Sequence, residues 1–233
     1  MKKKVLIIGG SRGIGFYLCK QLSELEVHAT YRSNYSKYDN IIWHKLDLGY
    51  CDQFDDFVNK LSKNKHKFNY VLFVAAHTPA LIGEEGVTFQ QKLNADSFSK
   101  YFLINAIAPS ILFEKIYINK LLSKNAVIVF FSSQAGSISL RGKLSHNLPG
   151  GNMVYRASKA ALNSCVKNIS YDTNPEELTI IALHPGWVQT DSGGIDADID
   201  MENASIQIKN RIYNLSSKDH GKFLTLNNQE LEW

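Results

Sequence analysis

Tyr155 and Lys159 are the two side chains in this 233-residue chain whose types and spacing best suit proton transfer. They lie in a segment with helical periodicity, where residues four apart share a face and their Cβ atoms are roughly 6 Å apart. A cation at that distance stabilises a phenolate, so the tyrosine exchanges its proton more readily than its ordinary pKa of about 10 suggests. A Tyr-x-x-x-Lys pair also occurs on helix surfaces without any function, so its meaning depends on the rest of the chain.

A glycine-rich turn follows the apolar run at residues 5–8, and helical spacing of apolar residues begins directly after it. Glycine lets a backbone turn sharply and approach a pyrophosphate, while the next helix offers free N–H groups and the positive end of its dipole. We predict that this turn binds the phosphates of a dinucleotide; the alternative is a plain turn in which Gly15 packs on the sheet. The predicted binding residues are Gly9, Ser11, Arg12, Gly13, Ile14 and Gly15.

The second predicted strand, residues 27–31, ends without the Asp or Glu that usually holds the ribose 2′-hydroxyl of NAD. Arg32 follows this strand, and Arg12 lies in the glycine turn. Two guanidinium groups converging on a 2′-phosphate would give charged, bidentate hydrogen bonds. We therefore expect NADP(H) to be preferred, with NAD(H) possible if both arginines are only surface residues.

Asp47 and Leu48 follow the third predicted strand, residues 41–46. A carboxylate at that place accepts a hydrogen bond from an adenine amino group, or it caps the helix that begins near Asp52. Asn105 interrupts an apolar helical run at residues 89–122 and needs buried partners. Ser133 ends the strand at 127–131, either as a turn serine or as a hydroxyl that reaches the same substrate oxygen as Tyr155.

Strand and helix patterns alternate along the whole chain, which predicts an α/β fold: a Rossmann-type, doubly wound, seven-stranded parallel sheet with helices on both faces. We expect one domain, 1–233, with a cofactor half at about 1–110 and a catalytic and substrate half at about 111–233. The ligand site of such a sheet lies beyond the carboxyl ends of its strands. The expected strands are 5–8, 27–31, 41–46, 71–75, 127–131, 178–183 and 223–226, and the expected later helices are 52–61, 89–122, 152–171 and 202–215.

Composition excludes several other classes of protein. The net charge of +4 is small and the basic residues are scattered, so we expect no nucleic-acid partner. The three cysteines form no Cys-x-x-Cys pair, which argues against a disulfide framework or a zinc site and fits a reducing, cytoplasmic location. The apolar run at 5–8 is too short for a signal peptide, and no uninterrupted run approaches the roughly 18 apolar residues of a membrane span.

The order of these motifs resembles the short-chain dehydrogenase/reductase family over nearly the whole chain. The glycine turn, Asp47, Asn105, Ser133, the Tyr155/Lys159 pair and Pro185-Gly186 follow one another as they do in that family. The stretches 155–163 and 183–191 and the terminal Trp233 resemble its C-factor/sniffer-like branch, which contains carbonyl reductases and also members discussed as signalling proteins.

The resemblance implies an NADP(H)-dependent oxidoreductase that transfers hydride between nicotinamide and a small carbonyl or alcohol substrate. Tyr155 would protonate the carbonyl oxygen and Ser133 would hold it. Lys159 would bind the nicotinamide ribose and lower the pKa of the tyrosine, and Asn105 would support a water that links Lys159 to solvent. Residues lining the cofactor would include Ala75, Ala76, Pro185, Gly186, Val188 and Thr190. The alternative is a non-catalytic NAD(P)-binding regulator.

The family also implies subunit pairing through the apolar helix at 104–122 and the helix of Tyr155, so we expect a homodimer or homotetramer. The chain departs from the family pattern at Ile8, where Thr is usual, and at Val74-Ala75-Ala76-His77, where Asn-Asn-Ala-Gly is usual. We expect the fold to tolerate both changes, with the backbone holding the cofactor there. His77 either faces the cofactor or substrate or is a partly exposed loop histidine.

Two loops are lid candidates, because both should overhang the predicted site. Residues 137–152 separate Ser133 from Tyr155, and residues 192–201 carry Asp196, Asp198 and Asp200. The substrate and the physiological direction of the reaction do not follow from these residues.

Overall fold

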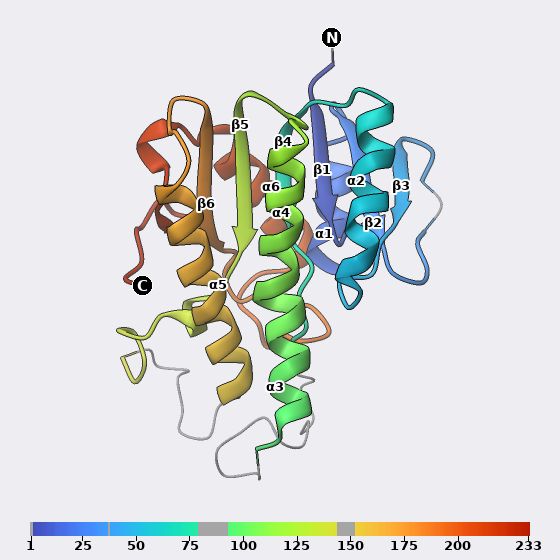
Figure 1. The fold of residues 1–233 in the computed structure, drawn as a ribbon. Coiled ribbons are helices and arrows are strands. Elements are labelled where there is room, and N and C mark those ends of the chain that lie inside the picture. Colours follow the sequence, from blue (N-terminus) through green and yellow to red (C-terminus); the bar gives the residue numbers. More distant parts are fainter. Residues whose placement is uncertain (1, 37, 79–92, 144–151) are drawn as a thin grey trace.

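The computed structural model describes residues 2–36, 38–78, 93–143 and 152–233. Seven strands, all parallel to their neighbours, form one sheet in the order β3-β2-β1-β4-β5-β6-β7 (Figure 1). The α/β, doubly wound architecture is therefore confirmed. The strands are β1 (Lys4–Ile8), β2 (Glu26–Tyr31), β3 (Ile41–Lys45), β4 (Phe68–Phe73), β5 (Leu122–Phe131), β6 (Leu178–His184) and β7 (Phe223–Thr225).

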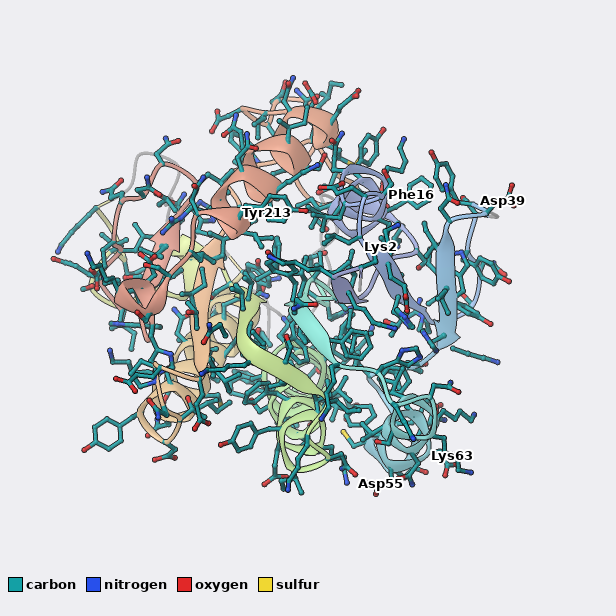
Figure 2. The ribbon with its side chains drawn as sticks, turned by 90° about the horizontal axis from the view of Figure 1, so that it is seen from above. Lys2, Phe16, Asp39, Asp55, Lys63 and Tyr213 are labelled. Atoms are coloured by element: carbon teal, nitrogen blue, oxygen red, sulfur yellow. The ribbon has the colours of Figure 1, made fainter. Side chains whose placement is uncertain are left out.

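Helices cover both faces of the sheet, as a view from above shows (Figure 2). One face carries α2 (Phe54–Lys63), α4 (Ala108–Ile118) and α5 (Met153–Tyr171). The other carries α1 (Gly13–Gln21) and α6 (Met201–Tyr213). The helix α3 (Ala95–Phe102) runs through a π-turn, Leu103–Ile107, into α4. Short 3₁₀ turns occupy Cys51–Gln53, Gln134–Gly136 and Ser217–Asp219.

Both faces of the central strands are buried, which explains why their sequences are mostly apolar. In β1, Leu6 and Ile8 join the core under α2, α4 and α5, while Val5 and Ile7 join the core under α1 and α6. Successive side chains of a strand point to opposite faces, so a strand covered on both faces is apolar at most positions.

Two predicted boundaries were wrong because the strands pair earlier than their most apolar stretches. The fourth strand ends at Phe73, and Val74 and Ala75 follow it, with their N–H groups donating to the Ile8 carbonyl at 3.0 and 2.8 Å. The fifth strand begins at Leu122 rather than 127, and a register irregularity separates its first pair from the rest. Of the helical run expected at 89–122, the described part is α3, the π-turn and α4.

The helical segment Ala95–Ile118 is long and apolar enough to cross a membrane, judged by length and composition alone. Buried core helices of globular proteins pass the same test. Here, Leu112 and Ile116 of its α4 part are fully buried in the core against the sheet.

The strand order places β1 between β2 and β4, so chain connections leave β1 in opposite directions on its two sides. A crevice for a ligand forms at such a switch point, beyond the carboxyl ends of the strands. The glycine turn follows β1 and Val74-Ala75-Ala76 follows β4, so both predicted segments lie at this place.

Candidate active site

Tyr155 and Lys159 lie on one face of α5, as their spacing predicts. Asn152 caps this helix, and its Oδ1 accepts a hydrogen bond from the Tyr155 N–H at 2.7 Å. Lys159 is one turn further along, 3% exposed, with its Nζ 6.0 Å from the centre of the Tyr155 ring. The cap therefore fixes the start of the helix two residues before the phenol and holds the pair in place.

Lys159 is buried without a counter-charge. Its Nζ donates to the carbonyl of Phe131, the last residue of β5, at 2.7 Å. Within the described residues, no carboxylate lies within ion-pair distance of it. Burial lowers the pKa of Lys159 to about 7, because taking an ammonium group out of water disfavours the charged form.

The pKa of Tyr155 does not follow the expected direction. Burial raises it, and the hydrogen bond of the Ser133 side chain and the charge of Arg156 only partly oppose that rise. No charge effect of Lys159 contributes to this shift, so the expected lowering by the lysine is not confirmed. A pKa above its usual value keeps the phenol protonated at neutral pH, which is the form a general acid requires.

The two serines after β5 have different partners. Ser132 is 4% exposed, and its hydroxyl donates to Asn163 Oδ1 on α5 at 2.5 Å. Ser133 caps the Gln134–Gly136 turn through its hydroxyl, which accepts from the Ala135 N–H at 3.2 Å, and it also hydrogen-bonds Tyr155. Ser133 is therefore the serine placed beside the phenol, and Ser132 is a buried structural residue.

Asn105 lies in the π-turn and is 1% exposed. Its Oδ1 accepts from the His77 N–H at 2.7 Å, while its Nδ2 donates to the His77 carbonyl at 2.8 Å and to Ser158 Oγ at 2.9 Å. Ser158 in turn donates to the Tyr155 carbonyl at 2.7 Å. Both amide donors are used, so the side chain ties the end of β4 to α5 and acts on the site through position.

His77 is half-buried in the loop after β4, as the alternative of a partly exposed loop histidine predicted, and Asn105 bonds both its N–H and its carbonyl. Its ring packs at 4.4 Å against the ring of Tyr101, and Tyr101 lies 6.5 Å from the ring of Tyr155. The histidine therefore borders the candidate site through one intervening aromatic ring.

The glycine turn has the shape that a diphosphate requires. A Cβ on Gly15 would lie 2.0 Å from the Gly9 carbonyl oxygen, and one on Gly9 would lie 2.6 Å from the Ala75 Cβ. Gly13 has φ +54°, and the space where its Cβ would stand is open. The backbone is thus tightly packed at Gly9 and Gly15 and leaves open space at Gly13, at the N-terminus of α1. This arrangement fits a pyrophosphate there.

Thr30 supplies a side-chain hydrogen bond next to Ile8, whose own side chain cannot form one. Its Oγ1 accepts from the Gly9 N–H at 2.8 Å, so β2 fixes the first glycine from the side. Gly136 is a second residue that the sequence prediction missed. A Cβ at this position would lie 2.7 Å from the Lys159 backbone, so only glycine lets the turn approach α5 this closely. A hydroxyl residue within the predicted strand was the available signal for Thr30, whereas nothing in the local sequence marked the contact of Gly136 with Lys159.

The residues predicted for the adenosine end are at the same edge of the sheet. Arg32 is exposed just after β2, and the exposed Arg12 lies 3.9 Å from Asp191 Oδ2. Asp47 Oδ1 accepts from the Gly49 N–H at 2.9 Å in the turn after β3, next to the buried Leu48. The alternative in which Asp47 caps the following helix is wrong, because α2 begins after Gln53 and has no side-chain cap.

The segment after β6 folds back on itself. Gly186 has φ +84°, Val188 pairs with Ile199, and Thr190 Oγ1 accepts from the Gly193 N–H at 3.0 Å. The Ser192 hydroxyl hydrogen-bonds Thr78. Together with the Arg12–Asp191 contact, this places the predicted lid next to both the glycine turn and the end of β4.

Two details limit the lid predictions. Asp200 accepts from the Asn203 N–H at 2.8 Å, so it is the cap of α6 rather than a lid residue. In the other lid candidate, residues 144–151 lie outside the described part of the chain.

A cavity of about 270 Å³ opens beside Pro185 and Gly186, toward β7. Its lining includes His184, Asp198 and Gln207, but none of Ser133, Tyr155 or Lys159. We therefore do not assign it to the reacting substrate.

Comparison with known proteins agrees with this geometry. The short chain dehydrogenase family matches residues 3–198. An uncharacterised oxidoreductase of Saccharomyces cerevisiae is 32% identical over 209 residues, which cover 82% of this chain and 77% of that protein. The C-signal of Myxococcus xanthus is 40% identical over 95 residues, 41% of this chain and 57% of that protein.

Among solved structures, the carbonyl reductase Sniffer of D. melanogaster superimposes with a TM-score of 0.82 at 27% identity, covering 100% of both chains. The NADPH-bound carbonyl reductase from chicken fatty liver superimposes with a TM-score of 0.84 at 25% identity, covering 100% of this chain and 99% of that one. This chain is therefore a member of the short-chain dehydrogenase/reductase family of oxidoreductases.

Proposed function

We propose that the protein is an NADP(H)-dependent carbonyl reductase or alcohol dehydrogenase in which Tyr155 is the general acid or base. The observation that carries the proposal is the half-buried phenol of Tyr155, with Ser133 hydrogen-bonded to it and the buried Lys159 on the same helix face. A phenol and a hydroxyl aimed at one point can both donate to a substrate oxygen.

The bound nicotinamide would supply the hydride. As negative charge develops on the substrate oxygen, Ser133 donates a hydrogen bond to it and Tyr155 gives up its proton. Lys159 then faces a phenolate, and its own pKa of about 7 lets it carry a proton at neutral pH. Asn105 keeps the end of β4 and α5 at a fixed separation, so the donors do not need to reorganise.

We assign cofactor binding to the carboxyl ends of β1, β2, β3, β4 and β6. The open space above Gly13 and the N-terminus of α1 suit the pyrophosphate. Lys159 suits the nicotinamide ribose, and Asp47 the adenine. Arg12 and Arg32 suit a 2′-phosphate, which would replace Asp191 as the partner of Arg12. The NADPH-bound carbonyl reductase from chicken fatty liver supports this choice of cofactor.

Fluorescence titration with NADPH and NADH tests the cofactor assignment. We expect NADPH to bind at least about tenfold more tightly, and we expect Arg32→Gln to remove most of that difference while NADH affinity stays the same. Equal affinities for the two cofactors would contradict the roles of both arginines.

A second candidate is a non-catalytic NAD(P)-binding regulator, favoured by the 40% identity to C-signal over 95 residues. A screen of aldehydes and ketones that follows NADPH absorbance separates the two. Turnover that disappears in Tyr155→Phe supports the reductase; silence with every carbonyl class while NADPH is bound supports the regulator.

We further propose a homodimer or homotetramer in the cytoplasm, with a small molecule and no nucleic acid or membrane as partner. The C-terminal part of α4 exposes apolar surface at Tyr117 and Ile118, the latter 65% exposed. Light scattering at micromolar concentration tests the assembly, and a monomer would contradict it.

A further inference from the structure

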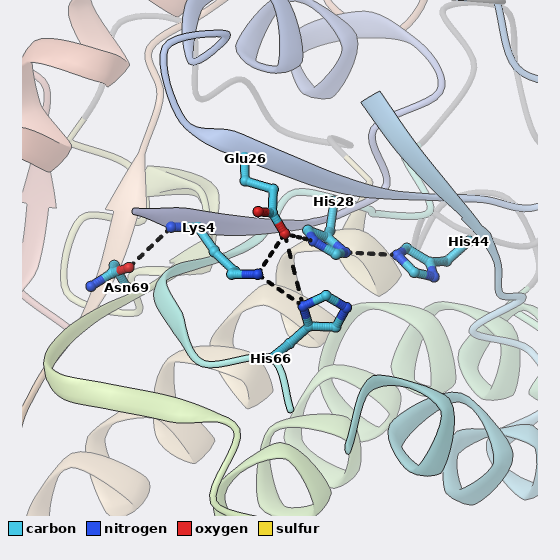
Figure 3. Close-up of polar contacts among 6 residues, drawn as sticks. All are labelled: Lys4, Glu26, His28, His44, His66 and Asn69. Atoms are coloured by element: carbon cyan, nitrogen blue, oxygen red, sulfur yellow. Dashed lines mark hydrogen bonds and ion pairs between the residues drawn. The ribbon is translucent and has the colours of Figure 1, made fainter. Parts of the chain in front are cut away.

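A cluster of ionisable side chains lies toward the amino ends of β1 and β2, with His44 of β3 beside it, away from the candidate active site at the carboxyl ends (Figure 3). It consists of Lys4, Glu26, His28, His44 and His66, and we call it the amino-edge cluster. The proposed reaction uses none of these residues. Four segments distant in sequence bring them together, so their convergence is a property of the fold.

Glu26 is at the centre of the cluster. Its Oε1 lies 2.6 Å from Lys4 Nζ, 2.9 Å from His28 Nε2 and 3.8 Å from His66 Nδ1. Lys4 Nζ also donates to His66 Nδ1 at 3.2 Å. The side chain of His28 is fully buried, and those of Glu26 and His66 are 30% and 13% exposed. An ammonium group is therefore held between a carboxylate and an imidazole that both direct acceptor atoms toward it.

The same atoms have the spacing of metal ligands. One atom each from Glu26, His28 and His66 lie within 4.8 Å of one another. A tetrahedral zinc ion with bonds of about 2.0–2.1 Å separates its ligand atoms by roughly 3.4 Å. The separations of 2.9 Å and 3.8 Å from Glu26 Oε1 lie on either side of that value, so rotations of the partly exposed Glu26 and His66 side chains would suffice.

We propose that Glu26, His28 and His66 form a binding site for a divalent transition-metal ion of the zinc class, which takes the place of the Lys4 ammonium group. Two imidazole nitrogens and one carboxylate oxygen suit zinc, cobalt and nickel better than magnesium or calcium. A water molecule completes the set as the fourth ligand. The Lys4 side chain is 24% exposed, so it can turn to solvent.

His44 forms a hydrogen bond with His28 both without and with the bound metal ion. Without the metal, the carboxylate accepts from His28 Nε2–H, so His28 Nδ1 accepts from His44 Nε2–H at 3.0 Å. With the metal on His28 Nε2, the proton of His28 moves to Nδ1 and His44 Nε2 becomes the acceptor, with its own proton on Nδ1. A metal-binding histidine commonly donates its other N–H to such a partner, which fixes the orientation of its ring.

The surroundings favour neutral imidazoles. Burial lowers the pKa of His28, His44 and His66, that of His44 to about 4. The charges of His28, His66 and Lys60 also lower the pKa of His44. For His28 and His66, Lys4 lowers the pKa and Glu26 raises it, without reversing the effect of burial. Near pH 7 the ligand nitrogens therefore do not have to lose an extra proton before a metal binds.

The consequence of binding is local. The ion would connect β2, through Glu26 and His28, to the segment between α2 and β4, through His66. Because the unfolded chain does not hold these ligands together, metal binding would stabilise the folded protein. The metal site and Tyr155 lie at opposite ends of the strands, so we assign the ion a structural role.

The test is a titration of tag-free protein with Co²⁺ and Zn²⁺ at pH 7.5. We expect one Co²⁺ per chain with the visible absorption of a low-coordinate ion, displaced by one equivalent of Zn²⁺ and accompanied by a higher Tm. Lys4→Met should tighten Zn²⁺ binding at least about tenfold, because the competing ammonium is gone. His66→Phe keeps the ring packing on Phe68, removes a ligand and should weaken binding at least about tenfold.

Lys2→Met is the matched control, since it removes one positive charge two residues before Lys4 without changing a cluster residue; its affinity for Zn²⁺ should stay within about twofold of wild type. Two outcomes overturn the proposal. One is the absence of Co²⁺ absorption in both wild type and Lys4→Met at about 1 mM Co²⁺, well above the affinity expected of three protein ligands. The other is a His66→Phe variant that binds Zn²⁺ as tightly as wild type.

Discussion

Each end of the sheet holds a lysine, buried at the carboxyl end and partly exposed at the amino end, and the two amines have different partners. At the carboxyl end, Lys159 is 3% exposed and bonded to a backbone carbonyl. At the amino end, Lys4 is paired with Glu26 at 2.6 Å. Hydrogen bonds from His28 and Lys4 lower the pKa of Glu26, whereas burial alone lowers the pKa of Lys159 to about 7.

The presence or absence of a carboxylate partner determines what each lysine is suited to do. A lysine with a carboxylate partner has a fixed charge and ties strands together or yields its place to another cation. A lysine buried without one destabilises the fold at neutral pH, and its charge responds to small changes in its surroundings. The carboxyl end therefore retains a costly group, which is the expected pattern at a site of proton transfer.

Lys159→Met tests that cost and has the largest expected effect. We expect turnover to fall at least about 10²-fold, while the cofactor-free protein becomes more stable at pH 7. The folded pKa is about 7 and the reference value is 10.5, so between these values the unfolded state binds more protons. The wild type should therefore gain about 1.4 kcal/mol per pH unit relative to the variant across this window.

Urea unfolding of both proteins from pH 6 to pH 10 measures this difference. The advantage of the variant should be greatest at and below pH 7 and disappear as the pH approaches 10.5. Parallel stability curves would mean that Lys159 is not desolvated in the folded protein.

The serine pair at the carboxyl end separates chemistry from structure. Ser133→Ala should lower turnover about 10²-fold and leave the unfolding free energy within about 0.5 kcal/mol, because it removes a donor to the reacting oxygen. Ser132→Ala should instead cost about 1–3 kcal/mol of stability, because Asn163 Oδ1 loses its buried partner. Steady-state kinetics and urea unfolding of both variants measure these effects. A loss of turnover in Ser132→Ala and a loss of stability in Ser133→Ala would contradict the assignment.

The smallest expected effect is at the amino end. His66→Phe should leave kcat and KM for a carbonyl substrate within about twofold of wild type in metal-free buffer, since its contacts are all at the far ends of the strands. A larger change in kcat would show that the two ends are coupled and would break the comparison.

The fold was largely predictable because both periodicities are strong in the sequence. All seven strands and the order of the motifs follow from apolar runs bounded by breakers, and the parallel sheet follows from their alternation with helices. The early starts of β4 and β5 did not, since they are set by pairing between Phe68 and Leu122 rather than by the apolar run itself. The π-turn at Asn105 has no sequence period of its own.

The candidate site shows the same division. The Tyr155/Lys159 pair was predictable from a local spacing, and Ser133 from its place at a strand end. The contact of Thr30 with Gly9 and that of Gly136 with Lys159 join residues from different elements, which only the folded chain brings together. The amino-edge cluster was missed for that reason, because its histidines are spread over residues 28–66 without a motif.

The most direct test of the central claim is the rate of hydride transfer in Tyr155→Phe under single-turnover conditions, with NADPH and the best carbonyl found in the screen. The variant keeps the ring that packs near Tyr101 and removes only the acid. We expect a rate lower by about 10²- to 10⁴-fold with NADPH affinity unchanged. A rate equal to that of the wild type would contradict the assignment of Tyr155 as the proton donor.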